Sequence, residues 1–267
     1  MSNKVNPMDK PTTYIGVRGH RGAGKPTVSF LLAGTIEWYI EKRSFDEEFE
    51  DYYKSLIEDI LRNPDDFICS RQFDYVYLES FSDTQRVMCS MLLGIDIDSF
   101  YSEYSKDHLK VHLCDLNVSE VEDTDHLVTA ESLLTQRNSG PYKNDLYMSL
   151  REFCSYYSLG LQKLMGEEIW IHSLNKSETN NREYGTPFKI FYDVKLPSEV
   201  SYIIERDGYI VKVLRPKHKK KETTLSSKLD NDDRVDFEVL IDGDDMISCK
   251  EDIKEITQVI VDGPGID

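Results

Sequence analysis

Residues 13–41 constrain the fold of this chain more than any other stretch. A short apolar run, residues 13–18, leads into the turn Gly19-His20-Arg21-Gly22-Ala23-Gly24, and Lys25 follows. From Val28 onward the apolar residues recur at helical spacing. We therefore predict a strand and a helix joined by a loop whose backbone N–H groups can surround an anion.

The spacing of the glycines and the lysine is that of a phosphate-binding P-loop. In such a loop Lys25 reaches the β- and γ-phosphates of a nucleotide, and the helix N-terminus adds its partial positive charge. The next position, where the pattern has Ser or Thr to hold Mg²⁺, is Pro26 here. Proline fits the first turn of a helix, so we expect the loop to keep its shape and Thr27 to take over part of the metal role. The alternative is a glycine-rich turn that binds nothing.

Composition narrows the class of protein. The 267 residues, 39% of them hydrophobic, suffice for one α/β domain with insertions. The net charge of −17 argues against broad attraction to nucleic acid or anionic membranes, although a local basic groove stays open. The sequence has no signal pattern and no long apolar segment, so we expect a cytoplasmic protein without a membrane span. Its five cysteines form no CxxC pair, and we expect reduced thiols at Cys69, Cys89, Cys114, Cys154 and Cys249.

Strand-like runs alternate with helical patterns along the rest of the chain. We predict strands at residues 73–79, 189–194, 209–214 and 237–241, and helices at 44–62, 80–94, 145–164, 198–207 and 250–261. Residues 175–187 are polar and are expected to form a loop. The alternation predicts an α/β fold with a mainly parallel sheet covered on both faces. We expect one domain, residues 1–267, with insertions at about 44–72 and 95–142.

Two clusters outside the strand and helix patterns need an interpretation. His108 and His112 lie four residues apart, with Cys114 close by, as in half of a metal site. We favour incidental histidines, because no second group of ligands follows at a suitable spacing. The lysine-rich run at residues 217–221 is interpreted as a solvated lid or tail, with phosphate binding as the less favoured reading.

Ligands of parallel sheets bind at the carboxyl ends of the strands. This rule places Asp83, Asp193 and Arg215 in one crevice with the P-loop, since each follows or ends a predicted strand.

Several segments, in this order, resemble the deoxynucleoside monophosphate kinases of bacteriophages and their relatives in the nucleoside monophosphate kinase group. Residues 24–28 are similar to the family's G-K-D-T-V or G-K-S-T, 80–86 to S-F-A-D-P-L-K, 193–199 to D-V-R-F-P-N-E, and 211–216 to a strand ending in R-P. The family also has a series of short motifs in the order R-E-x-L-Q, G-T-D, R and W-V. Residues 150–153 and 168–171 are similar to parts of this series. Family residues are replaced at Ser155, Ser158, Leu159, Gly160, Lys163 and Lys195, and the last two are lysines where the family has arginine.

The resemblance implies a three-layer P-loop kinase fold with a mainly parallel sheet and helical insertions. It also implies ATP- and Mg²⁺-dependent phosphoryl transfer to a deoxynucleoside 5′-monophosphate, giving the diphosphate. The implied catalytic residues are Lys25, Arg151, Lys163 and Asp193. The implied ATP-binding residues are Gly19, Gly22, Ala23, Gly24, Lys25, Pro26, Thr27 and Arg215. Acceptor binding is implied for Asp83, Arg86, Arg151 and Lys195, and Mg²⁺ binding for Thr27 and Asp193.

Two other functions stay open at this point. A nucleotide-binding or interaction protein that has lost catalysis is favoured by Pro26, Leu159 and the two lysines that replace arginines. A P-loop kinase that acts on a modified base in phage DNA would fit the altered acceptor residues, although the acidity of the chain argues against it. The base that is accepted and the oligomeric state, a homodimer included, are open as well.

Overall fold

The computed structural model describes residues 11–20, 22–64, 67–113, 116–120, 147–180, 186–216, 233–243 and 245–263. The chain divides into two compact units. The first contains Met1–Phe81 and Lys176–Asp267, and the second contains Ser82–Asn175. Helix α8 (Ile169–Asn180) runs across the boundary between them.

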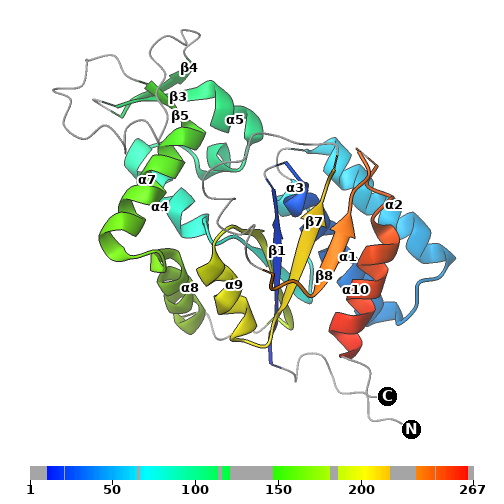
Figure 1. Ribbon diagram of the computed structural model, residues 1–267. Helices are drawn as coiled ribbons and strands as arrows, with labels where there is room; N and C mark the ends of the chain where they lie inside the picture. The colour runs from blue at the N-terminus through cyan, green and yellow to red at the C-terminus, as the bar shows by residue number, and fades with distance from the viewer. Residues whose placement is uncertain are drawn as a thin grey trace. The chain divides into compact units, whose positions relative to one another are not determined.

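The first unit is built on a five-stranded sheet in the order β2-β6-β1-β7-β8. Its strands are β1 (Thr13–Gly19), β2 (Val76–Glu79), β6 (Phe188–Val194), β7 (Tyr209–Leu214) and β8 (Phe237–Leu240). Among these strands, Figure 1 labels β1, β7 and β8. All four strand pairings are parallel, so the carboxyl ends of the five strands lie at one edge. The predicted α/β fold with a mainly parallel sheet is thereby confirmed.

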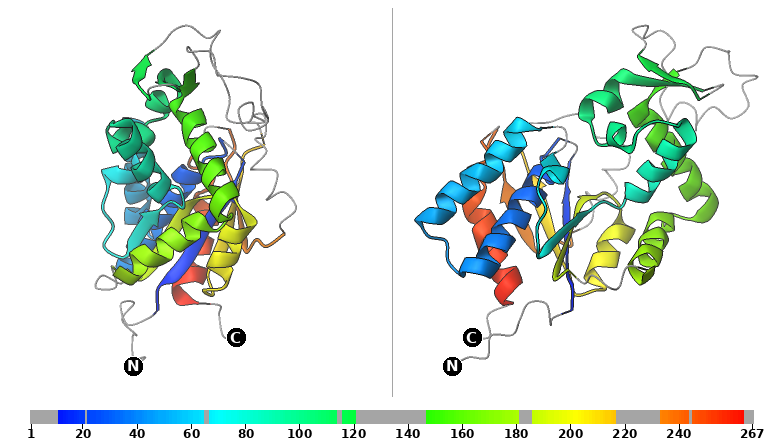
Figure 2. Two further views of the ribbon diagram at one scale, coloured as in Figure 1. Left: turned by 90° about the vertical axis from the view of Figure 1, so that its left-hand side faces the viewer. Right: turned by 180° about the vertical axis from the view of Figure 1, so that it is seen from behind.

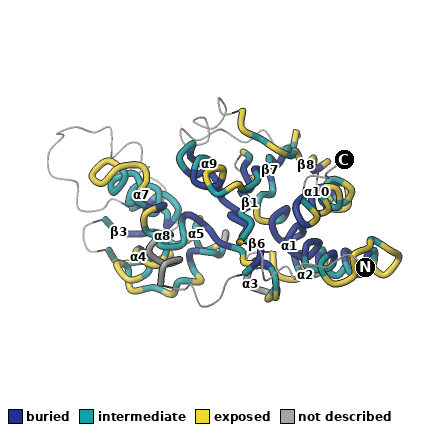
Figure 3. Tube along the Cα trace, turned by 90° about the horizontal axis from the view of Figure 1, so that it is seen from below, coloured by how far each residue is buried: buried dark blue, intermediate teal, exposed yellow. Residues whose placement is uncertain are grey.

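Helices cover both faces of this sheet, which is consistent with a three-layer arrangement (Figure 2). On one face lie α1 (Lys25–Lys42), α2 (Glu47–Arg62), α3 (Phe67–Ser70) and α10 (Lys250–Asp262). They bury a shared core with Ile15 and Val17 of β1. The other face packs on α9 (Pro197–Ile204), where a Cβ added to Gly16 would lie 2.4 Å from Cδ1 of Ile203. The central strand β1 is accordingly buried on both sides (Figure 3).

Local sequence signals set the helix starts. Helix α1 begins at Lys25 with Pro26 in its first turn, so the proline is tolerated there as predicted. Helix α2 begins after Asp46, whose carboxylate accepts the N–H of Phe49 at 3.3 Å. The helix therefore starts within the predicted segment 44–62.

The second unit has a small sheet of its own. It contains α4 (Asp83–Leu93), the 3₁₀ helix η2 (Ile97–Phe100), α5 (Glu103–His108), β3 (Leu109–His112), β4 (Val118–Glu120), β5 (Tyr147–Ser149) and α7 (Leu150–Met165). The strands form an antiparallel sheet in the order β4-β3-β5. A buried hydrophobic cluster of this unit contains Cys89, Phe100, Val111, Met148, Leu150 and Phe153. This unit is larger than the predicted insertion at residues 95–142, of which residues 114–115 and 121–142 lie outside the described part.

Two sequence expectations need correction. The loop predicted from residue 175 is wrong for residues 175–180, because α8 continues to Asn180. Trp170, Ile171 and Leu174 are buried and hold this helix, and the polar residues that follow extend it. The strand predicted from residue 73 begins only at Val76. None of the helices in the described part of the chain has the length and hydrophobicity needed to span a lipid bilayer.

Candidate functional site

The glycine loop joins the carboxyl end of the central strand β1 to α1; we use this name for Gly19, His20, Gly22, Ala23 and Gly24. Gly22 and Gly24 have φ angles of 81° and 90°, which residues with a side chain rarely adopt. Gly24 is the N-cap of α1, and a Cβ at this position would lie 2.9 Å from Cδ1 of Ile241. The shape of the loop therefore depends on glycine at these two positions.

The loop presents backbone donors. Among the described residues, no acceptor pairs with the N–H groups of Gly22, Gly24, Lys25 or Thr27. The first N–H groups of a helix have no partner within the helix, and here they follow a turn of two left-handed glycines. Such a set of N–H groups at a helix N-terminus favours a bound anion.

Lys25 folds back on the loop. Its ammonium donates to the carbonyl oxygens of Gly19 at 2.9 Å and His20 at 3.0 Å. Burial away from water lowers the pKa of Lys25 from 10.5 to about 8, the charge of Lys195 lowers it further, and Asp193 opposes the shift. A negatively charged ligand would favour the ammonium form of Lys25.

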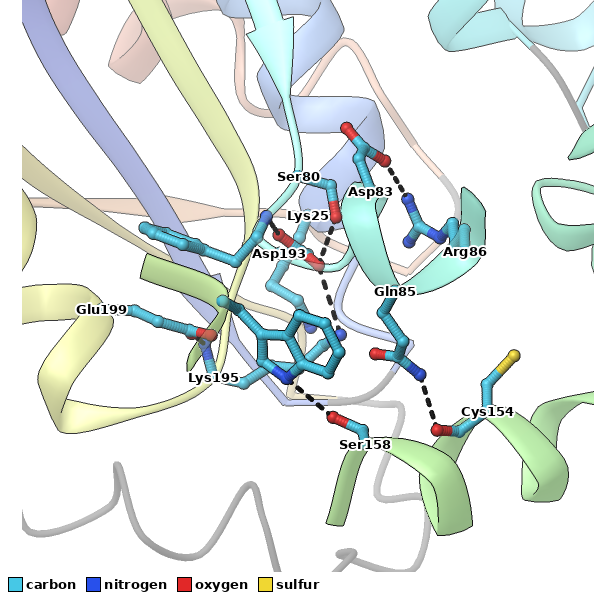
Figure 4. Close-up of polar contacts among 12 residues, drawn as sticks. Lys25, Ser80, Asp83, Gln85, Arg86, Cys154, Ser158, Asp193, Lys195 and Glu199 are labelled. Atoms are coloured by element: carbon cyan, nitrogen blue, oxygen red, sulfur yellow. Dashed lines mark hydrogen bonds and ion pairs between the residues drawn. The ribbon is translucent and has the colours of Figure 1, made fainter. Parts of the chain in front are cut away.

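Asp193, near the end of β6, is held by residues that directly follow the neighbouring strand β2 and by Lys195 (Figure 4). Its Oδ2 accepts the hydroxyl of Ser80 at 2.5 Å and lies 3.3 Å from Nζ of Lys195. Its Oδ1 accepts the backbone N–H of Phe81 at 2.9 Å. Asp193 is only 6% exposed, so these donors offset the cost of burying its charge.

Glu199 lies in the first turn of α9 and is buried beside this group. Its Oε2 accepts the N–H groups of Lys195 at 2.6 Å and Leu196 at 2.9 Å. Burial, and then the charge of Asp193, raise the pKa of Glu199 to about 7, although the two N–H groups favour its charged form. Glu199 thus fixes the turn between Asp193 and α9.

Arg215 connects the glycine loop to the turn after β8. Its Nη1 donates to the carbonyl oxygen of Gly22 at 3.3 Å, and its Nε donates to that of Gly243 at 2.6 Å. The first unit therefore brings together the glycine loop, Lys25, Asp193, Lys195 and Arg215 at the carboxyl edge of its sheet.

The other predicted site residues belong to the second unit. Arg86 and Asp83 form an ion pair of 2.7 Å (Figure 4). The hydroxyl of Tyr101 also donates to Asp83, at 2.9 Å. The guanidinium of Arg86 lies 4.8 Å from the centre of the Tyr101 ring. These residues form a braced group at the start of α4.

Arg151 and Lys163 do not lie together. They occupy the first and last turns of α7, about 18 Å apart along a helix axis. Arg151 donates to Asp107 of α5 at 2.7 Å, whereas Lys163 is exposed. The two residues cannot contact one phosphate group while α7 is intact.

The rings of His108 and His112 lie against aromatic side chains. The ring of His108 stacks on Tyr104 at 4.0 Å, and that of His112 lies 4.9 Å from Tyr147. The described residues contain no cluster of three or more His, Cys, Asp or Glu side chains suited to a metal ion. Cys114 and the lysine-rich run at residues 217–221 lie outside the described part. Cys89, Cys154 and Cys249 form no disulfide within the described part of the chain.

Sequence reasoning assigned no role to two residues that shape this site, Ser80 and Glu199. Ser80 ends the strand-like run before Asp83, but its partner Asp193 is 113 positions away. Glu199 follows Pro197 at the third position of α9, where glutamate often caps a helix, and this spacing is the signal that marks it.

Chemically, the first-unit site combines two ammonium groups, a fixed carboxylate, and backbone donors that have no acceptor among the described residues. Backbone donors and cations suit phosphate oxygens, and the carboxylate suits a hard cation. Compared with known proteins, the chain matches no family model and no curated sequence.

Proposed function

We propose that the glycine loop is a P-loop that binds ATP, and that the protein transfers the γ-phosphoryl group to a deoxynucleoside 5′-monophosphate. One observation carries the proposal: at the carboxyl end of the central strand, Lys25 lies with four backbone N–H groups that have no acceptor among the described residues. This is the edge at which parallel sheets bind ligands. The ordered resemblance to monophosphate kinases supplies the choice of acceptor.

The reaction requires positioning and charge neutralisation. An oxygen of the acceptor's 5′-phosphate attacks the γ-phosphorus, the bond from this phosphorus to the β-phosphate oxygen breaks, and ADP leaves. Lys25 would exchange the carbonyls of Gly19 and His20 for phosphate oxygens. Lys195 would add a second positive charge, which Asp193 and Glu199 hold in place.

Mg²⁺ fits the oxygen donors of this site. Asp193 would hold the ion through water, since its oxygens already accept from Ser80, Phe81 and Lys195. Thr27 is half-buried, and its hydroxyl makes no hydrogen bond to another described residue, so it can serve as a ligand where Pro26 cannot. When bound, Mg²⁺ would neutralise charge on the β- and γ-phosphates.

We assign acceptor binding to the braced group of the second unit. Arg86 would hold the acceptor's phosphate, and Asp83 and Tyr101 would keep its guanidinium oriented. Arg151 and Lys163 remain candidates for separate contacts, since they lie at opposite ends of α7.

Coupled assays of ADP release over the four deoxynucleoside monophosphates test this proposal. We expect turnover with one or more acceptors, and Lys25→Ala should lower kcat by about 10²–10³, as when one preorganised donor is removed from an active site. Lys54→Ala, which removes an exposed lysine of α2, is the matched control. Absence of turnover with every acceptor would refute the kinase assignment.

A second function, nucleotide binding without turnover, is favoured by the exposed Pro26 in the first turn of α1. It predicts ATP binding by the wild type with no release of ADP. Pro26→Thr would then restore turnover if the missing hydroxyl is the only defect. Turnover by the wild-type protein would eliminate this candidate.

A further inference from the structure

Arg215 lies where three segments of the first unit meet. It follows β7, which pairs with β1 on one side and β8 on the other. Its guanidinium spans the segments that leave these two neighbours, since Nη1 donates to Gly22 and Nε to Gly243. Arg215 is therefore bound at once to the glycine loop and to the turn after β8.

The turn after β8 is braced by its own hydrogen bonds. The N–H of Asp245 donates to the carbonyl of Asp242 at 3.2 Å, and the hydroxyl of Ser248 donates to the carbonyl of Asp245 at 2.6 Å. The turn is also anchored to β7, because the N–H of Ile241 donates to the carbonyl of Leu214 at 2.9 Å. Gly243 thus offers Arg215 a carbonyl in a fixed position.

The glycine loop is held by hydrogen bonds of its own among the described residues. Ala23 donates to His20 at 3.1 Å, and the ammonium of Lys25 binds the carbonyls of Gly19 and His20. The two lysine contacts are the ones that Lys25 would give up on reaching a phosphate. The contact from Arg215 to Gly22 involves no atom of Lys25, so it does not have to be given up in that exchange.

We propose that Arg215 is a positioning residue that holds the glycine loop in its binding shape by tying the carbonyl of Gly22 to the turn at Gly243. Its guanidinium acts on the loop and not on the phosphate. The tie needs a planar group with donors at two fixed directions, which an ammonium does not provide. The consequence for nucleotide binding rests on the proposed function.

Three variants test whether Arg215 positions the loop or contacts the phosphate directly: Arg215→Lys, Arg215→Gln and Arg215→Ala. The control is Lys212→Ala on the same strand, which removes a surface ion pair with Glu238. Hydrogen–deuterium exchange without ligand should show faster exchange in peptides that cover residues 19–24 in all three variants, and no change in peptides from α10. This measurement does not depend on any ligand.

Calorimetric titration with Mg²⁺–ATP and with tripolyphosphate gives the second readout. We expect all three variants to lose affinity by about 5–20-fold, with the salt dependence of the wild type, because the phosphate loses no cation. Thermal denaturation identifies any variant that fails to fold. If Arg215→Ala fails to fold, the test rests on Arg215→Lys and Arg215→Gln.

Two results would overturn the tie. One is wild-type affinity in Arg215→Lys together with a weaker salt dependence in Arg215→Ala, which indicates a phosphate contact. The other is unchanged exchange of the loop peptides in the folded variants. If the wild type binds neither ATP nor tripolyphosphate, the proposed function fails, and the exchange data still decide whether the tie exists.

Discussion

Ionisable side chains at the carboxyl edge of the sheet influence one another through burial and charge. Lys25 has a lowered pKa and Glu199 a raised pKa, and both shifts arise mainly from the loss of water around the group. The folded protein therefore favours the charged form of each group less than water does. Their titration therefore provides tests at the level of single residues.

Glu199 should make the folded protein less stable as the pH rises. Its pKa is about 7 when folded against 4.5 as a reference, so its favourable contribution is present below pH 4.5 and is lost as the pH rises through 7. Glu199→Gln keeps an oxygen acceptor but does not titrate. We expect the free energy of unfolding of the wild type to fall relative to this variant by up to about 3 kcal/mol between pH 4.5 and 8.

Urea denaturation at several pH values measures this difference. Glu58→Gln, at an exposed position of α2, is the control and should follow the wild type. The same pH dependence in Glu199→Gln and in the wild type would show that Glu199 is not the group that titrates.

The lowered pKa of Lys25 leads to a prediction about the pH dependence of ATP binding. Its ammonium form predominates below pH 8 and is lost above it, so affinity for ATP should fall by up to about tenfold per pH unit above 8. Titration calorimetry from pH 6.5 to 9.5 measures the profile. Lys25→Met should bind weakly and show no such decline, and a wild-type affinity that stays constant through pH 9 would contradict the assignment.

At the level of secondary-structure elements, the sequence predicted long helices and strands better than short ones. The run at residues 209–214 coincides with β7, because branched and aromatic residues bounded by Gly208 and Pro216 mark a strand. Strands β3, β4 and β5 have only three or four residues, too few for a period to stand out.

The hydrogen-bond partners of the candidate site residues were harder to predict from the sequence than the site residues themselves. Spacing identified Lys25, and the end of an apolar run identified Asp193. The contact of Asp193 with Ser80 depends on β2 lying next to β6, and strand order is not encoded in local periodicity. The tie made by Arg215 likewise depends on the order β1-β7-β8.

Substitution of two helix glycines by alanine should change the stability of the protein in opposite directions. A Cβ on Gly34 of α1 would lie 2.5 Å from Cδ1 of Leu56 on α2, whereas one on Gly160 of α7 would meet no atom within 4 Å. Gly34→Ala should therefore destabilise the protein by about 1–3 kcal/mol through overpacking. Gly160→Ala should stabilise it by about 0.5–1 kcal/mol, because alanine costs less entropy in a helix. Denaturant midpoints of both variants test this pair, and a stabilising Gly34→Ala would refute the close packing of α1 on α2.

At the scale of the whole molecule, the proposed donor and acceptor residues belong to different compact units. The glycine loop and Lys25 are in the first unit, and Asp83 and Arg86 are in the second. A ligand that binds only the folded state raises its stability by about 2.7 kcal/mol at a hundred times its Kd. Stabilisation by each nucleotide can thus be assigned to residues of one unit.

We expect Mg²⁺–ATP and the accepted monophosphate each to raise the Tm of the wild type by several degrees. Lys25→Ala should lose the shift with ATP and keep the shift with the monophosphate. Arg86→Ala should show the reverse, because it removes the partner of Asp83 and leaves the glycine loop unchanged. Scanning calorimetry of the two variants with each ligand gives four comparisons. Loss of both shifts in Arg86→Ala would mean that the two units do not bind their ligands separately, and a retained monophosphate shift would remove Arg86 from the acceptor site.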